Sequence, residues 1–135
     1  MDIITKVVFT NGCFDILHEG HIKLLTECKR LGDVIVGLNS DFSVRKLKGD
    51  DRPVNNQEKR KEALKATGLV DVVIIFYDET PFDLILAIQP DYLVKGGDYK
   101  EDDIIGSDFV KSYGGHVVIV PLVEGFSTTK IIKKI

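Results

Sequence analysis

The sequence predicts an α/β fold: a single doubly wound domain whose five-stranded parallel sheet carries helices on both faces. The length of 135 residues is close to the commonest size of one domain, so we expect a single domain over residues 1–135. Short β-rich runs alternate with stretches of helical period, which implies right-handed crossovers between parallel strands. Residues 34–38 (VIVGL) are continuously apolar, which is typical of a strand buried on both faces of such a sheet.

The five strands are each expected from a short run of apolar and β-branched residues. They are residues 6–10, 34–38, 70–76, 92–94 and 117–120. Helices are expected between and after them, at residues 21–31, 57–66, 81–88, 104–113 and 128–134. Gly32 ends the first helix, and Pro81 suits the first position of the third. Residues 39–55 are polar, and a loop of that length in a small domain is usually functional.

The composition excludes several classes of protein. A hydrophobic fraction of 44% and a charged fraction of 29% fit a globular protein and argue against disorder. No apolar run approaches the roughly 20 residues that span a bilayer, and the first residues lack the features of a secretory signal. We therefore expect a cytoplasmic protein that does not associate with membranes. Cys13 and Cys28 are too few for a disulfide scaffold, so both are expected to be free thiols.

The charge is unevenly distributed along the chain. The net charge of −3 argues against a generally basic nucleic-acid-binding protein, so no nucleic acid partner is expected. Residues 45–61 contain seven basic and three acidic side chains, a local charge of +4 that leaves −7 for the remainder. A basic segment on an acidic protein indicates a small anionic ligand, although a solvated loop and helix surface would have the same charge.

Ligands of doubly wound folds bind at the carboxyl ends of the strands, so the residues that follow each strand are the informative ones. Glycine, small polar residues and charges gather there, in the segments 11–15, 39–41, 95–99 and 124–129. Since these ends lie at one edge of a parallel sheet, the sequence predicts a polar ligand site at that edge.

The segment HEGH at residues 18–21 carries the most specific signal. His18 and His21 are three residues apart, which places both rings on one face of a helix. Gly20 allows close approach of a ligand to the backbone, and the amide groups at a helix start favour an anion. These features predict a phosphate site. The histidines could instead bind zinc, although no third ligand has suitable spacing, or they could cap the helix or pack in the core.

Residues 11–21 (NGCFDILHEGH) resemble the opening motif of the nucleotidylyltransferases of the HxGH, or cytidylyltransferase-like, superfamily, and residues 125–131 (GFSTTKI) resemble their closing Ser-Thr-Thr motif. Residues 48–55 and 93–99 are further similar to the heptose-1-phosphate adenylyltransferase domain of ADP-heptose synthases. The resemblance covers essentially the whole chain. It implies a Rossmann-like nucleotidyltransferase fold and transfer of AMP from ATP to a sugar 1-phosphate. It also implies ADP-heptose as product, for lipopolysaccharide or other surface glycans, and a homodimer.

The implied reaction needs no general base, because the attacking phosphate is already mostly dianionic at pH 7. Catalysis is then positioning and cationic stabilisation, with Mg²⁺ neutralising the triphosphate and no metal held by the protein itself. The implied catalytic residues are His18, His21 and Lys46. The implied nucleotide-binding residues are Asn11, Gly12, Cys13, Phe14, Gly20, Arg60, Lys95, Gly96, Gly97, Asp98, Ser127, Thr128 and Thr129. The implied substrate-binding residues are Asp15, Asn39, Lys48 and Arg52. The loop at residues 39–55 is expected to order over the bound phosphates.

Some of these residues also fit simpler roles. Ser127 could be only a helix N-cap, Gly96 and Gly97 only a turn, and Lys46 only a solvated charge. Glycerol-3-phosphate cytidylyltransferase shares the Ser-Thr-Thr-Lys ending. It has an arginine where this chain has Leu122 and Met-Gly-Asp-Asp-Trp where this chain has residues 95–99, so another residue must take over the role of the arginine. A nucleotide-binding module without turnover is the candidate from another functional class.

Overall fold

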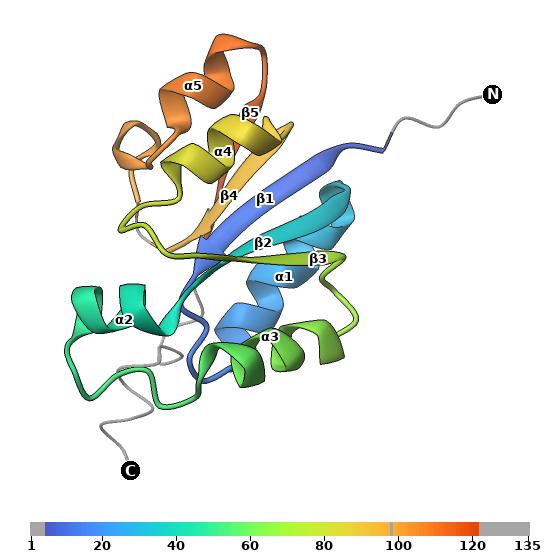
Figure 1. Cartoon of the computed structure of the whole chain (residues 1–135). Helices are drawn as coiled ribbons and strands as arrows, with labels where there is room; N and C mark the ends of the chain where they lie inside the picture. Colours follow the sequence, from blue (N-terminus) through green and yellow to red (C-terminus); the bar gives the residue numbers. More distant parts are fainter. Residues whose placement is uncertain (1–4, 98, 122–135) are drawn as a thin grey trace.

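The computed structural model describes residues 5–97 and 99–121. Its five strands are parallel and form one sheet in the order β3-β2-β1-β4-β5. They are β1 (Val7–Gly12), β2 (Asp33–Asn39), β3 (Val72–Phe76), β4 (Tyr92–Gly96) and β5 (His116–Val120). The chain starts in the middle of the sheet and winds outward in both directions (Figure 1). The predicted doubly wound fold is confirmed, and the strand order reverses between β1 and β4.

Helices cover both faces of this sheet. On one face lie α1 (Glu19–Leu31) and α3 (Gln57–Ala66), and on the other lie α4 (Phe82–Ile88) and α5 (Ser107–Ser112) (Figure 1). A short 3₁₀ turn, η1 (Glu101–Asp103), precedes α5. The remaining helix, α2 (Asp41–Lys48), extends beyond the carboxyl ends of the strands (Figure 1).

Alternation along the strands divides the core in two. Val8 of β1 packs with Leu25 of α1 and Leu64 of α3, whereas its neighbour Phe9 packs with Ile85 of α4 on the other face. All of these side chains are fully buried, and burial of one such side chain contributes about 1.5–3 kcal/mol. The packed sheet therefore holds the carboxyl ends of β1, β2 and β4 in fixed positions, which is where the predicted site residues begin.

The predicted long loop is the main difference between sequence and structure. Residues 41–48 form α2, so the prediction of a loop was wrong there. The Ser40 hydroxyl accepts a hydrogen bond from the Ser43 N–H at 3.1 Å and caps the helix, a common role for serine at this position. Gly49, at a φ of +107°, ends it. Burial of Val44 on the sheet side stabilises the helix in spite of its polar sequence.

The other differences concern the ends of elements. Pro81 is the N-cap of α4 instead of its first helical residue, and the helix expected at residues 104–113 is limited to Ser107–Ser112. The helix expected at residues 128–134 lies outside the described residues. Cys13 and Cys28 are free thiols, as predicted. None of the helices in the two described ranges is long and apolar enough to cross a membrane.

Candidate active site

The two histidines of the HEGH segment lie together at the amino end of α1. Their ring centroids are 3.8 Å apart and the rings are stacked, with an angle of 25° between their planes. Phe14 lies on the other side of His21, at 5.1 Å between centroids. The structure thus brings both rings to one place, as their spacing in the sequence predicts.

The hydrogen bonding of His18 fixes which ring nitrogen carries the proton. His18 is the N-cap of α1, and its Nδ1 accepts a hydrogen bond from the Gly20 N–H at 3.1 Å. Because an accepting nitrogen is unprotonated, the proton of the neutral ring resides on Nε2. Helix capping, one of the alternatives to phosphate binding in the sequence analysis, is therefore a confirmed role of His18. The same bond fixes the orientation of the His18 ring at the start of α1.

Both histidines are neutral at pH 7. Burial lowers the pKa of His18. Burial also lowers the pKa of His21 to about 4. Protonation of His18 and the positive charge of Lys48 each oppose protonation of His21 as well, while the backbone of Ile16 acts in the opposite direction. The pair therefore acts by donating hydrogen bonds and not as two fixed positive charges.

Gly12 and Phe14 shape the turn between β1 and the histidines. Phe14 has a φ of +45°, a left-handed conformation that is uncommon for a bulky residue. A Cβ atom added to Gly12 would lie 3.1 Å from Cε2 of Phe14. A side chain at position 12 would therefore press on the Phe14 ring, which contacts His21. Approach of a nucleotide to Gly12 stays a prediction.

Lys95 and Asn11 meet where the strand order reverses between β1 and β4. Lys95 Nζ donates to Asn11 Oδ1 at 3.3 Å and lies 5.5 Å from the centre of the Tyr99 ring. Burial lowers the pKa of Lys95. A pocket of about 130 Å³ opens beside these three side chains and is closed by Pro81 and Ile104. Gly97 follows β4 at a φ of +122°, a conformation that favours glycine, and its contact with a nucleotide stays a prediction.

Of the two lysines in the last turns of α2, Lys48 is the one whose charge acts on His21. The positive charge of Lys48 lowers the pKa of His21, and it also opposes the rise that burial causes in the pKa of Cys13. Lys46 Nζ instead lies 4.9 Å above the ring of Phe42, within its own helix. The catalytic role implied for Lys46 stays a prediction, and Lys48 is a second candidate for it. Sequence reasoning missed this distinction because a loop gives neighbouring lysines no fixed direction.

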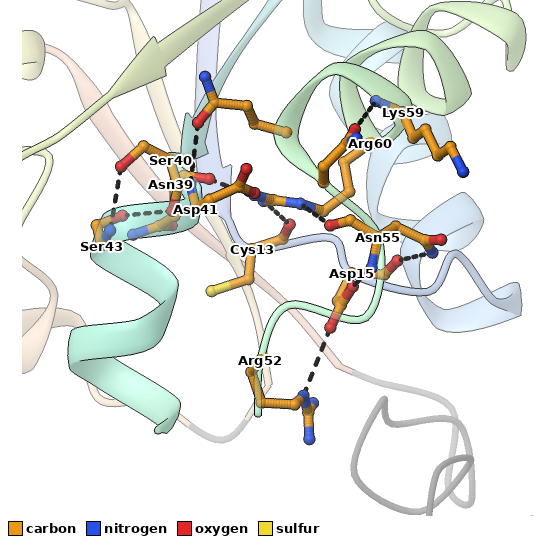
Figure 2. A network of polar contacts seen from close by, with 12 residues as sticks. Cys13, Asp15, Asn39, Ser40, Asp41, Ser43, Arg52, Asn55, Lys59 and Arg60 are labelled. Atoms are coloured by element: carbon orange, nitrogen blue, oxygen red, sulfur yellow. Dashed lines mark hydrogen bonds and ion pairs between the residues drawn. The ribbon is translucent and has the colours of Figure 1, made fainter. Parts of the chain in front are cut away.

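Arg60, which is predicted to contact phosphate, is bonded to protein groups in the structure, and its phosphate contact stays a prediction. Its side chain is 0% exposed. Nε donates to the carbonyl of Asn55, Nη1 donates to the carbonyls of Cys13 and Asn39, and Nη2 donates to Asp41 Oδ1, all at 2.7–2.9 Å (Figure 2). A buried arginine needs such partners, and they use four of its five N–H donors.

Asp15 is likewise bonded within the protein, and its predicted substrate contact stays a prediction. The carboxylate is buried and accepts hydrogen bonds from the backbone N–H groups of Val54 and Asn55, both at 2.8 Å (Figure 2). Arg52 Nε lies 3.4 Å from the same carboxylate. The physical reason is that two oriented backbone donors and one cation satisfy the charge inside the protein. Asp15 therefore attaches residues 52–55 to the turn that follows β1.

Three other predicted residues lie at the same edge. Arg52 Nη2 is buried and has no hydrogen-bond partner, so a substrate contact for Arg52 stays a prediction. Asn39 is buried and offers its carbonyl to Arg60, and its predicted substrate contact is also untested. Burial raises the pKa of the Cys13 thiol, which disfavours a nucleophilic role. Asp98, Ser127, Thr128 and Thr129, together with Leu122, lie outside the described residues.

Within the described residues no group of three or more His, Cys, Asp or Glu side chains is placed to hold a metal ion. Paired histidines stand at a helix start, on the edge of a doubly wound parallel sheet where the strand order reverses, which is where ligand sites of this class of α/β protein lie. Residues 9–134 match the model of the cytidylyltransferase-like family, and the chain belongs to that family.

Curated relatives are similar to the chain over nearly its full length. The bifunctional protein HldE of Koribacter versatilis is 54% identical over 130 residues, which are 96% of this chain and 27% of the relative. HldE of Campylobacter concisus is 56% identical over 131 residues, again 96% of this chain and 27% of the relative. The chain thus spans about a quarter of the length of these relatives.

Solved structures share the fold. The lipopolysaccharide core biosynthesis protein of Thermoplasma volcanium superposes with a TM-score of 0.70 at 28% identity, covering 88% of this chain and 97% of that protein. A pantoate-beta-alanine ligase from Francisella tularensis superposes with a TM-score of 0.66 at 16% identity, covering 97% of this chain and 66% of the ligase. The second similarity is one of fold alone.

Proposed function

We propose that the chain transfers AMP from ATP to a heptose 1-phosphate and releases ADP-heptose and pyrophosphate. The observation that carries the proposal is the stacked, neutral pair of His18 and His21 at the start of α1, with the positive charge of Lys48 acting on it. The family supports nucleotidyl transfer. The HldE relatives and the lipopolysaccharide core biosynthesis protein support a heptose as acceptor and a surface glycan as destination of the product.

The reaction is a displacement at the α-phosphorus of ATP. An oxygen of the sugar phosphate forms a bond to this phosphorus, the bond to the bridging oxygen of the β-phosphate breaks, and pyrophosphate leaves with the electron pair. The nucleophile arrives as a dianion, so no side chain has to remove a proton. The barrier lies in bringing two anions together and in the charge that develops on the leaving group.

The chain supplies donors for that charge. His18 Nε2–H and the ring of His21 are suited to donate to oxygens of the triphosphate beside the amino end of α1, whose backbone N–H groups favour an anion. Lys48 supplies the positive charge between the two substrates. Lys95, buried next to Asn11, is suited to an oxygen of the nucleotide or of the sugar.

Mg²⁺ is expected to arrive with the triphosphate. Asp15, the carboxylate at the turn after β1, is already occupied by two backbone donors and Arg52. The residues therefore fit an ion held by phosphate oxygens and not one held by a protein cage. Its chemistry would be neutralisation of the triphosphate.

A matrix of nucleoside triphosphates against sugar and polyol phosphates, scored by release of pyrophosphate with Mg²⁺, tests the proposal. We expect ATP with a heptose 1-phosphate to be the best pair. Preference for CTP with glycerol 3-phosphate would overturn the heptose assignment. Binding of ATP without turnover on any acceptor would show that the chain is a nucleotide-binding module and not an enzyme. The proposed homodimer is tested separately by sedimentation equilibrium, where a monomeric mass would contradict it.

A further inference from the structure

Arg60 joins four separate segments at the active edge of the molecule. Its guanidinium bonds to the carbonyl of Cys13 after β1, to the carbonyl of Asn39 at the end of β2, and to the carbonyl of Asn55 before α3. The fourth bond, 2.8 Å from Nη2 to Asp41 Oδ1, reaches the first residue of α2. Figure 2 shows these partners converging on the guanidinium from different elements.

The bond to Asp41 differs from the other three, because it alone reaches the helix that carries the lysines. A second bond at the same residue, from the Asp41 N–H to Gln57 Oε1 at 3.0 Å, also joins the start of α2 to the start of α3. The buried residues of α2 are Ser43 and Val44, near its amino end, whereas residues 45–48 are exposed. The helix itself is therefore held through its amino-terminal half, and the next attachment along the chain is the bonding of residues 52–55 to Asp15.

Because of the length of α2, the position of its carboxyl end is sensitive to how its amino end is held. An eight-residue helix is about 12 Å long at about 1.5 Å per residue. A tilt of roughly 10° at the attached end moves the far end by about 2 Å. A misplacement of about 1 Å at a reacting centre can lower the rate about 100-fold. A change in the tilt of α2 would thus move Lys48 relative to the phosphates of the bound substrates.

We propose that Arg60 and Asp41 are positioning residues for nucleotidyl transfer: their ion pair sets the angle of α2 and so the place of Lys48 beside His18 and His21. Neither side chain needs to touch a substrate. The catalytic part rests on the proposed function, because it assigns Lys48 to the transferred phosphoryl group. The attachment itself does not depend on any activity.

The first part of the test substitutes Asp41, because its side chain is 27% exposed. Removal of the fully buried Arg60 would risk unfolding the protein. Asp41→Ala should lower kcat at least 10-fold, with the KM for ATP changed less than threefold, because the histidines remain in place. Asp41→Asn keeps an acceptor oxygen and should recover most of the loss. The control is Lys29→Gln, which breaks an ion pair of equal length, to Asp71, elsewhere in the fold. Equal kcat for Asp41→Ala and the control would overturn the proposal.

The second part of the test does not depend on enzymatic activity. Amide hydrogen exchange on the whole chain should be at least 10-fold faster over residues 44–48 in Asp41→Ala than in wild type, and unchanged there in Lys29→Gln. Exchange that stays at the wild-type rate would overturn the attachment. If wild type releases no pyrophosphate with any pair of substrates, the proposed function fails, and the exchange measurement still decides whether Asp41 holds α2.

Discussion

His18 uses its two ring nitrogens for different purposes. Nδ1 caps α1 by accepting from the Gly20 N–H, and this bond leaves the proton on Nε2, which is the nitrogen proposed to contact the triphosphate. One residue thus serves both the stability of the helix and the chemistry. The two roles are separable by substitution, because asparagine is also a good N-cap and has no imidazole.

His18→Asn should keep the free energy of unfolding near that of wild type and lower kcat by about 10²–10³, the usual loss for one charge-stabilising donor. His18→Ala should lose the same activity and, in addition, about 0.5–2 kcal/mol of stability, since it cannot cap. Urea unfolding and steady-state release of pyrophosphate measure the two effects. If His18→Asn had the kcat of wild type, His18 would have no catalytic role and would serve only as the helix cap.

His21 should make the protein less stable in mild acid. Its folded pKa of about 4 lies below its ordinary value of 6.5, so the unfolded chain takes up the proton first as the pH falls. The free energy of unfolding should therefore be unaffected by this group above about pH 6.5 and decline from there toward pH 4. Carboxylates titrate in part of this window, so His21→Gln is the control. An identical pH dependence in His21→Gln and wild type would contradict the assignment.

Among the elements, α2 is the helix that the sequence pattern does not predict. Residues 39–55 resemble a loop because charged and polar residues dominate them. The signals for a helix are present but short: Ser40 as a cap, Val44 and Leu47 three residues apart, and Gly49 directly after the last turn. Eight residues form a stable helix only through packing on the rest of the protein, and that packing cannot be read from a local pattern.

The direction of α2 yields a prediction for its two lysines. Lys48→Ala should lower kcat by about 10²-fold or more, because its charge acts on His21. Lys46→Ala should have the smaller effect, since its ammonium lies over Phe42. Both side chains are exposed, so either substitution should change stability by less than about 0.5 kcal/mol. Kinetics and melting temperatures of the pair measure this, and a larger loss of kcat in Lys46→Ala would restore the assignment made from the sequence.

At the scale of the whole molecule, the sequence predicts the layers better than the connections. Buried runs such as residues 34–38 indicate a parallel sheet, and the residues after the strands are correctly expected at one edge. The strand order depends on pairings between distant segments, which no local pattern encodes. Arg60 and Asp15 are interpreted from the sequence as ligand contacts because residue type does not reveal burial. Both instead connect the segments that carry the site.

The amino ends of the strands lie opposite the candidate site, and residues there should affect stability alone. There, Asp71 accepts from the Val34 N–H at 2.7 Å and from Lys29 at 2.8 Å, and Asp91 accepts from the Val7 N–H at 2.8 Å. These carboxylates bond to the backbone where β2 and β1 begin. Strands of five to seven residues separate them from the histidines by about 17–20 Å.

Asp71→Ala should therefore lower the free energy of unfolding by about 1 kcal/mol, a modest value because the pair is partly exposed, and leave kcat and KM unchanged. The hydrogen bond from Lys29, followed by the one from the Val34 backbone, lowers the folded pKa of Asp71. Its contribution is thus fully present above the ordinary pKa of about 3.9 and is lost as the pH falls below it. Urea unfolding of wild type and variant should give curves that differ at pH 7 and converge in acid. A changed kcat in Asp71→Ala would show that the two edges of the sheet are coupled.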